Sequence, residues 1–129
     1  MPDPCPFCAL PPARVIDREG PVLAFLDGYP VSPGHTLVIP ARHVASFRDL
    51  TPSEWSAVHV LLLRRAAALR AADPTITGFN VGINDGSDAG QTIFHCHIHL
   101  IPRRPGDHPH PRGGVRAVIP ALADYPSPT

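Results

Sequence analysis

One strong helix signal, at residues 51–73, divides the chain into two stretches rich in short apolar segments. Thr51 is suited to cap a helix, Pro52 fits the first helical position, and Glu54 completes a capping box with Thr51. Asp73-Pro74 ends the pattern. Between these limits apolar residues recur at helical spacing and predict one buried stripe: Trp55, Val58, Leu62, Ala66 and Leu69.

Short runs of apolar and β-branched residues on both sides of this helix predict strands. We expect them at residues 14–19, 22–27, 36–39, 78–84 and 91–101. Gly20-Pro21 joins the first pair as a tight turn, and Pro40 stops the third strand. Strands before and after one long helix are typical of an α+β domain, so we predict an antiparallel sheet of about five strands with one helix packed on it.

The length of 129 residues fits one compact domain with its own core. Prolines at positions 102, 105, 109, 111, 120, 126 and 128 predict irregular, extended chain in the C-terminal part, with one short strand at residues 115–119. We expect the domain to span residues 1–104 and to begin with a short knuckle at residues 1–12. A Pro-rich tail, residues 105–129, is expected to pack on the domain or extend it.

The charged residues exclude several classes of function. All 11 basic side chains are Arg, which rules out a Walker-type phosphate loop and a Schiff-base enzyme, because both require Lys. The net charge of zero gives no positive field that would attract nucleic acid or an anionic membrane. The longest strongly apolar run, residues 60–63, is too short to span a membrane. Three Cys, an odd number, and a start without a secretory leader favour a reduced, soluble, cytoplasmic protein.

Three histidines at a spacing of two, His95, His97 and His99, fall within the strand expected at residues 91–101. We call them the triad. In a strand they project from one face, while Cys96 and its alternate neighbours face the other. Imidazoles buried without partners cost free energy, so this stripe favours a polar site or a metal, although a solvent-exposed strand face is the alternative.

The triad, followed by two apolar residues, resembles the signature of the histidine triad (HIT) superfamily of nucleotide hydrolases and transferases. Other segments match recurrent segments of that family in the same order: Phe25-Leu26-Asp27, Pro33 to Pro40, Arg42-His43, Gly78-Phe79-Asn80, Asn84-Asp85-Gly86 and Ala89-Gly90-Gln91. The resemblance extends from residue 5 to residue 104. Several motifs in the right order make it more specific than the triad alone.

The resemblance implies roles for the triad and for the segments near it. His97, the middle histidine, is the expected nucleophile, which attacks the α-phosphorus of a nucleotide and forms a nucleotidyl-histidine intermediate. His99 is expected to donate a hydrogen bond to the phosphate and to assist the leaving group, and His95 completes the catalytic set. His35 matches a position near the family's site, although an ordinary loop histidine is an equal reading.

The same resemblance assigns substrate contacts. The loop before the triad is expected to supply phosphate donors, although taken alone it reads as a turn. Asp27 is expected to accept the ribose hydroxyls, or to open the turn that follows it. The residues implied for the phosphate are Asn84, Gly90, Gln91 and Thr92, and those implied for the base are Ile16, Phe25 and Leu26.

Cys5 and Cys8 have the spacing of zinc ligands. Resemblance to the Cys-containing branch of the family suggests His43 and His95 as the remaining ligands of a structural zinc that ties the knuckle to the sheet. A redox-active or unligated cysteine pair is the alternative.

The sequence thus predicts a hydrolase acting at the α-phosphorus of nucleoside phosphoramidates or related nucleotidyl conjugates. A dinucleoside polyphosphate hydrolase or phosphorylase is the alternative within the family, and a zinc-stabilised nucleotide-binding module with little turnover is the alternative outside it. Family resemblance also implies a homodimer. We expect no nucleic-acid or membrane partner.

Overall fold

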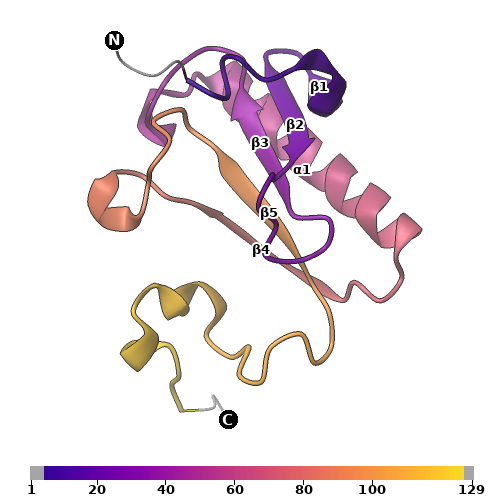
Figure 1. The fold of residues 1–129 in the computed structure, drawn as a ribbon, viewed down its shortest axis with the longest axis vertical. Helices are drawn as coiled ribbons and strands as arrows, with labels where there is room; N and C mark the ends of the chain where they lie inside the picture. The colour runs from indigo at the N-terminus through magenta and orange to yellow at the C-terminus, as the bar shows by residue number, and fades with distance from the viewer. Residues whose placement is uncertain (1–4, 127–129) are drawn as a thin grey trace.

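Five antiparallel strands form one sheet in the computed structural model, which describes residues 5–126 (Figure 1). The strands follow the order β1-β2-β3-β5-β4 across the sheet. Their bounds are β1 Val15–Glu19, β2 Val22–Leu26, β3 Thr36–Pro40, β4 Gly78–Ile83 and β5 Ile98–Arg103. The predicted α+β architecture is confirmed. Residues 1–4 of the predicted knuckle and 127–129 of the predicted tail lie outside the described residues.

The one long helix, α1 (Pro52–Ala72), begins at the predicted capping box. The Thr51 hydroxyl accepts from the Glu54 N–H at 3.1 Å, and the Glu54 carboxylate accepts from the Thr51 N–H at 2.8 Å. Glu54 is buried and also binds the Arg42 guanidinium at 2.8 Å. The predicted stripe is confirmed in part: Val58 is buried and Leu62 packs on the core, whereas Trp55 is 39 % exposed. Ala57 and Leu61, which the stripe did not include, are the other buried apolar residues of α1.

The sheet has apolar side chains on both faces. One face packs against α1 through Val22, Ala24, Val38 and Ile98. The other face carries Leu23, Phe25, Leu37 and Ile39 beside Val15 of β1, and it is covered by Phe7 and Leu10 from the N-terminal part of the chain. Because successive strand residues point to opposite faces, the second set shares its face with His99, which lies opposite Leu37 in the β3–β5 pairing.

The predicted strand at residues 91–101 is wrong in its limits, since β5 covers Ile98–Arg103. His95 and His97 therefore precede the strand instead of lying in it. The Cys96 N–H donates to the Val44 carbonyl at 2.7 Å, so this segment pairs with a loop and not with a strand. Pro102 is tolerated in β5 because the pairing with β3 ends at Leu100, where no further N–H is required on that side.

The tail has no strand at residues 115–119. Residues Gly114–Val118 form a 3₁₀ helix beside β4, and Pro120–Leu122 form another (Figure 1). Gly113 adopts a φ of 89° and approaches the Ala123 carbonyl so closely that a Cβ would clash, so the chain reverses here instead of extending. The division into residues 1–104 and a tail stays a prediction. No helix among the described residues is long and apolar enough to cross a membrane.

Candidate active site and metal centre

The triad gathers at the start of β5, on the face of the sheet opposite α1. His95 is completely buried and His97 is 9 % exposed. His99 is the second residue of β5, paired with Leu37 of β3 and Gly82 of β4, and its ring centroid lies 5.2 Å from that of His97. Cys96 faces the core against α1, as expected, and burial raises its pKa to about 11.

Hydrogen bonds fix which nitrogen of His97 carries its proton. His97 Nδ1 lies 2.8 Å from the His95 main-chain oxygen, and because a carbonyl only accepts, Nδ1 must be the donor. The neutral ring therefore has its lone pair on Nε2. An imidazole with a fixed Nδ1–H and a free Nε2 lone pair is the form required of a nucleophile.

His99 receives its orientation from His35 on the neighbouring strand end. The Val31 N–H donates to His35 Nδ1 at 3.1 Å, so a neutral His35 has its proton on Nε2. That Nε2 lies 2.9 Å from His99 Nδ1 and 3.5 Å from the Asp27 carboxylate. His99 Nδ1 is thus an acceptor, which leaves Nε2–H as the donor that His99 offers.

Burial keeps three histidines around His97 in their neutral forms: His35, His95 and His99. Burial, followed by the proximity of His97 and His35, lowers the pKa of His99 to about 4. Burial also lowers the pKa of His35 and that of His95. At neutral pH, His99 and His35 are therefore hydrogen-bonding imidazoles and not cations.

Asp27, His35 and His99 lie close enough together to suggest a second metal site. The Val31 N–H argues against it, because it occupies His35 Nδ1 and so keeps a proton on the Nε2 that a metal would need. His35 instead donates to His99, and the Asp27 carboxylate lies 3.5 Å from the same His35 nitrogen.

The loop that precedes the triad is fixed by Gln91. This buried side chain accepts from the Gly86 N–H at 2.8 Å and donates to the carbonyls of Ala45 and Ile93 at 2.9 and 3.1 Å. Both of its N–H groups are thus already donated to the main chain, so a phosphate contact from Gln91 would require one of these bonds to break. Gly90 has a φ of 95°, lies next to Asn84 and is exposed, as is Thr92.

The residues predicted for the nucleoside divide between core and surface. Phe25 is buried, whereas Ile16 and Leu26 are 39 % and 47 % exposed on the adjacent strands β1 and β2. One oxygen of Asp27 accepts from the Tyr29 N–H at 2.8 Å, so this residue does begin the turn, and its other oxygen faces His35.

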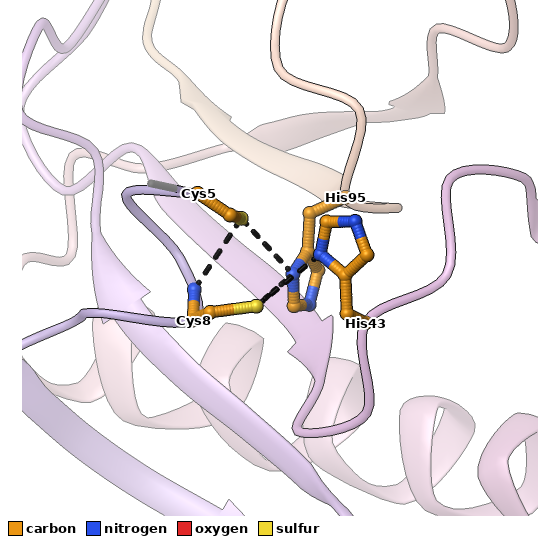
Figure 2. Close-up of side chains that lie close together, drawn as sticks. All are labelled: Cys5, Cys8, His43 and His95. Atoms are coloured by element: carbon orange, nitrogen blue, oxygen red, sulfur yellow. Dashed lines mark hydrogen bonds between the residues drawn. The ribbon is translucent and has the colours of Figure 1, made fainter. Parts of the chain in front are cut away.

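Cys5, Cys8, His43 and His95 meet in one cluster, although they come from three separate parts of the chain (Figure 2). The Cys8 sulfur lies 3.2 Å from His43 Nδ1 and 3.6 Å from His95 Nδ1, and the Cys5 sulfur lies 3.5 Å from His95 Nδ1. A tetrahedral zinc with ordinary bond lengths would hold sulfur and nitrogen ligands about 3.5 Å apart.

The tautomer of His95 and the thiol of Cys8 also suit the binding of a cation. His95 Nε2 donates to the Pro40 carbonyl at 2.7 Å, which leaves the Nδ1 lone pair directed at the sulfurs. Desolvation, followed by the adjacent Cys5 thiol, raises the pKa of Cys8, and a bound cation would reverse this effect. The four residues therefore fit a closed zinc site with no position for water, which is a structural and not a catalytic arrangement.

Comparison with known proteins agrees with this geometry. The HIT domain profile matches residues 11–106. The chain belongs to the HIT family. An uncharacterised HIT-like protein of Mycobacterium tuberculosis is 41 % identical over 111 residues, which cover 81 % of this chain and 74 % of the relative. The asymmetrical bis(5'-nucleosyl)-tetraphosphatase of Schizosaccharomyces pombe is 40 % identical over 95 residues, covering 74 % of this chain and 52 % of that protein.

Among solved structures, a Zn-bound histidine triad family protein from Mycobacterium smegmatis superposes on the HIT chain with a TM-score of 0.72. It is 37 % identical, and the match covers 92 % of this chain and 93 % of that one.

Two residues of the HIT site carried no firm assignment from the sequence. The position of His35 after Pro33-Gly34 was compatible with an ordinary loop. Only the structure shows that His35 is buried and hydrogen-bonded to His99. Phe7 is an aromatic residue between two cysteines, and its ring lies 5.1 Å from that of His97. The sequence does show an aromatic residue between the two cysteines. Its spacing alone does not show that the Phe7 ring contacts the ring of His97.

The half-buried His99 is expected to make the folded protein less stable in acid. Its pKa is lowered from 6.5 to about 4, so between these values the unfolded chain binds a proton that the folded chain does not. This contribution to stability is fully present above pH 6.5 and is lost as the pH falls to about 4, by about 2 to 3 kcal/mol. The free energy of unfolding in urea should fall between about pH 7 and about pH 4.5, and this fall should be larger in wild type than in His99→Gln by the same amount. Equal drops would contradict the assignment.

Proposed function

We propose that this HIT protein hydrolyses nucleotidyl conjugates at the α-phosphorus through a covalent intermediate on His97. The observation that carries the proposal is the bond from His97 Nδ1 to the His95 carbonyl at 2.8 Å, which leaves the Nε2 lone pair for attack. Attack by Nε2 forms an N–P bond while the bond from phosphorus to the leaving group breaks, and the leaving group takes a proton from water as it departs. Water then cleaves the N–P bond, releasing a nucleoside monophosphate and restoring His97.

His99 is proposed to serve this reaction as a neutral donor. Because its pKa is lowered to about 4, it carries no proton to give at neutral pH beyond its Nε2–H. That N–H can stabilise charge that develops on a phosphate oxygen, which favours this role over general acid catalysis. The exposed loop at Gly90 and Thr92 is proposed to supply further donors, with Asn84 beside it and Gln91 holding the loop in shape.

The nucleoside is proposed to lie over β1 and β2. A carboxylate has about four acceptor positions, so Asp27 can accept from ribose hydroxyls while it keeps its bond to Tyr29. Ile16 and Leu26 offer exposed apolar surface for the base on β1 and β2, next to the strand position of the buried Phe25.

Two leaving groups fit this chemistry. An amine, as in a nucleoside phosphoramidate, is the class that we place first, because such a substrate requires room for only one nucleotide. The similarity to the tetraphosphatase of Schizosaccharomyces pombe supports a dinucleoside polyphosphate as the second class. A module that binds nucleotide without turnover would gain nothing from a fixed His97 tautomer.

Removal of His97 is expected to lower turnover of adenosine 5'-phosphoramidate and of diadenosine tetraphosphate by about a thousandfold in His97→Ala. Mass spectrometry after quenching in alkaline denaturant, which preserves N–P bonds, should find an adenylyl adduct in wild type and none in the variant. His59→Ala removes an exposed histidine of α1 and serves as the control. No adduct and no turnover in wild type with either substrate would overturn the enzyme proposal and favour the binding module.

The Cys5, Cys8, His43 and His95 cluster is proposed to hold structural zinc. Protein prepared without chelator is expected to contain about one zinc per chain, because the cluster supplies four ligands. His43→Ala should reduce the zinc content and lower the midpoint of thermal unfolding, whereas His59→Ala, also an exposed histidine, should change neither. Metal-free wild type of undiminished stability would refute the proposal.

A second copy of the chain is proposed to pair with β4. Within residues 5–126, β5 is the only strand that pairs with β4, and beside β4 lies an apolar groove of about 420 Å³ lined by Phe47, Trp55, Leu62 and Val81. An unpaired edge next to exposed apolar side chains favours association.

Analytical ultracentrifugation should find a dimer whose dissociation constant rises at least about tenfold in Val81→Arg, since a charge would enter the interface. Val118→Arg, at a 78 % exposed position of the tail, is the control. A wild-type monomer at high concentration would contradict the pairing.

A further inference from the structure

Phe7 joins the cysteine cluster to the triad. It lies between Cys5 and Cys8 in a tight turn, in which the Ala9 N–H donates to the Cys5 carbonyl at 3.0 Å and the Cys8 N–H donates to the Cys5 sulfur at 3.4 Å. The direction of the Phe7 side chain is therefore set by the same backbone that presents the two sulfurs.

The Phe7 ring contacts three other rings on the face of the sheet opposite α1. Its centroid lies 5.3 Å from that of Phe25, 5.8 Å from that of His95 and 5.1 Å from that of His97. The interplanar angles are 65°, 76° and 80°, which are the favourable edge-to-face geometry for aromatic pairs. Phe25 supports Phe7 from the core, and Phe7 in turn packs against the two buried histidines.

His95 provides a second connection between the same two places. Its Nδ1 faces the sulfurs at 3.5 and 3.6 Å, its Nε2 donates to the Pro40 carbonyl, and its main-chain oxygen accepts the His97 Nδ1–H. A single hydrogen bond sets the tautomer of His97 but leaves its ring free to tilt. Packing by Phe7 and by His99, whose ring centroids lie 5.1 and 5.2 Å from that of His97, removes this freedom.

We infer that Phe7 is a positioning residue through which the metal-holding knuckle fixes the imidazole of His97. The inference rests on the proposed function of His97 as a nucleophile. Attack at phosphorus requires Nε2 to be aligned with the bond that breaks, and a small misplacement of a reacting group lowers the rate strongly. Loss of the metal or of the Phe7 ring therefore disorders the nucleophile, even though neither touches the reacting atoms.

A different role for Phe7 would be contact with the base of the nucleotide. In that case its removal would weaken substrate binding and raise KM, while kcat would be unchanged. Positioning of His97 predicts the opposite, a lower kcat with little change in KM.

The test compares zinc-loaded wild type with Phe7→Leu, which removes the ring but keeps an apolar side chain of similar size. Phe79→Leu makes the same change at the start of β4, at a residue paired with Pro102, and is the matched control. Phe7→Tyr keeps the ring and is expected to restore wild-type behaviour. The readouts are zinc content, the ¹⁵N–¹H correlation spectrum of the His97 ring, and kcat and KM for adenosine 5'-phosphoramidate.

In Phe7→Leu we expect unchanged zinc content, an exchange-broadened His97 ring signal, and a kcat lower by about threefold to tenfold. Wild type stripped of zinc should show the same broadening. Three results would overturn the inference. They are a His97 ring signal in Phe7→Leu as sharp as in wild type, a rise in KM without a fall in kcat, and a Phe7→Tyr variant as impaired as Phe7→Leu. If wild type turns over no substrate, the proposed function fails, but the ring spectra still decide whether Phe7 positions His97.

Discussion

The hydrogen bond from His97 Nδ1 to the main-chain oxygen of His95 is the interaction on which the site depends. It sets the tautomer of the proposed nucleophile, and its acceptor belongs to a residue that is fixed at both ring nitrogens. One of those nitrogens donates to Pro40 at the end of β3, and the other faces the sulfurs of the knuckle. A residue held at both ring nitrogens is a rigid base for the residue two positions on, although neither of them lies in a strand.

A second chain of hydrogen bonds runs from the Val31 N–H through His35 to His99. It reaches the site from the loop before β3, so His97 and His99 are oriented from different parts of the fold. Burial lowers the pKa of His35 and that of His99, which keeps both imidazoles of this second chain neutral. These neutral imidazoles agree with the net charge of zero, because an anionic phosphate would be held by N–H groups and not by cations.

The knuckle is therefore more than a clamp for the N-terminus. It covers the face of the sheet opposite α1, where Phe7 and Leu10 pack on Phe25 and its neighbours, and it supplies the ring that contacts His97. Without this cover, one face of β2 and β3 would expose its apolar side chains to water.

The sequence by itself determined the helix start at Thr51, the strands near residues 15–40 and 78–83, and the histidine spacing, because caps, turns and alternation act over a few residues. It placed His95 and His97 in a strand, because spacing does not show that Cys96 pairs with the Val44 loop. Likewise, it could not show that the Gln91 amide is used by the main chain, or that His35 and Phe7 meet the triad. Only the tertiary structure decided these points, since each depends on a contact between parts of the chain far apart in sequence, and such contacts leave no local pattern.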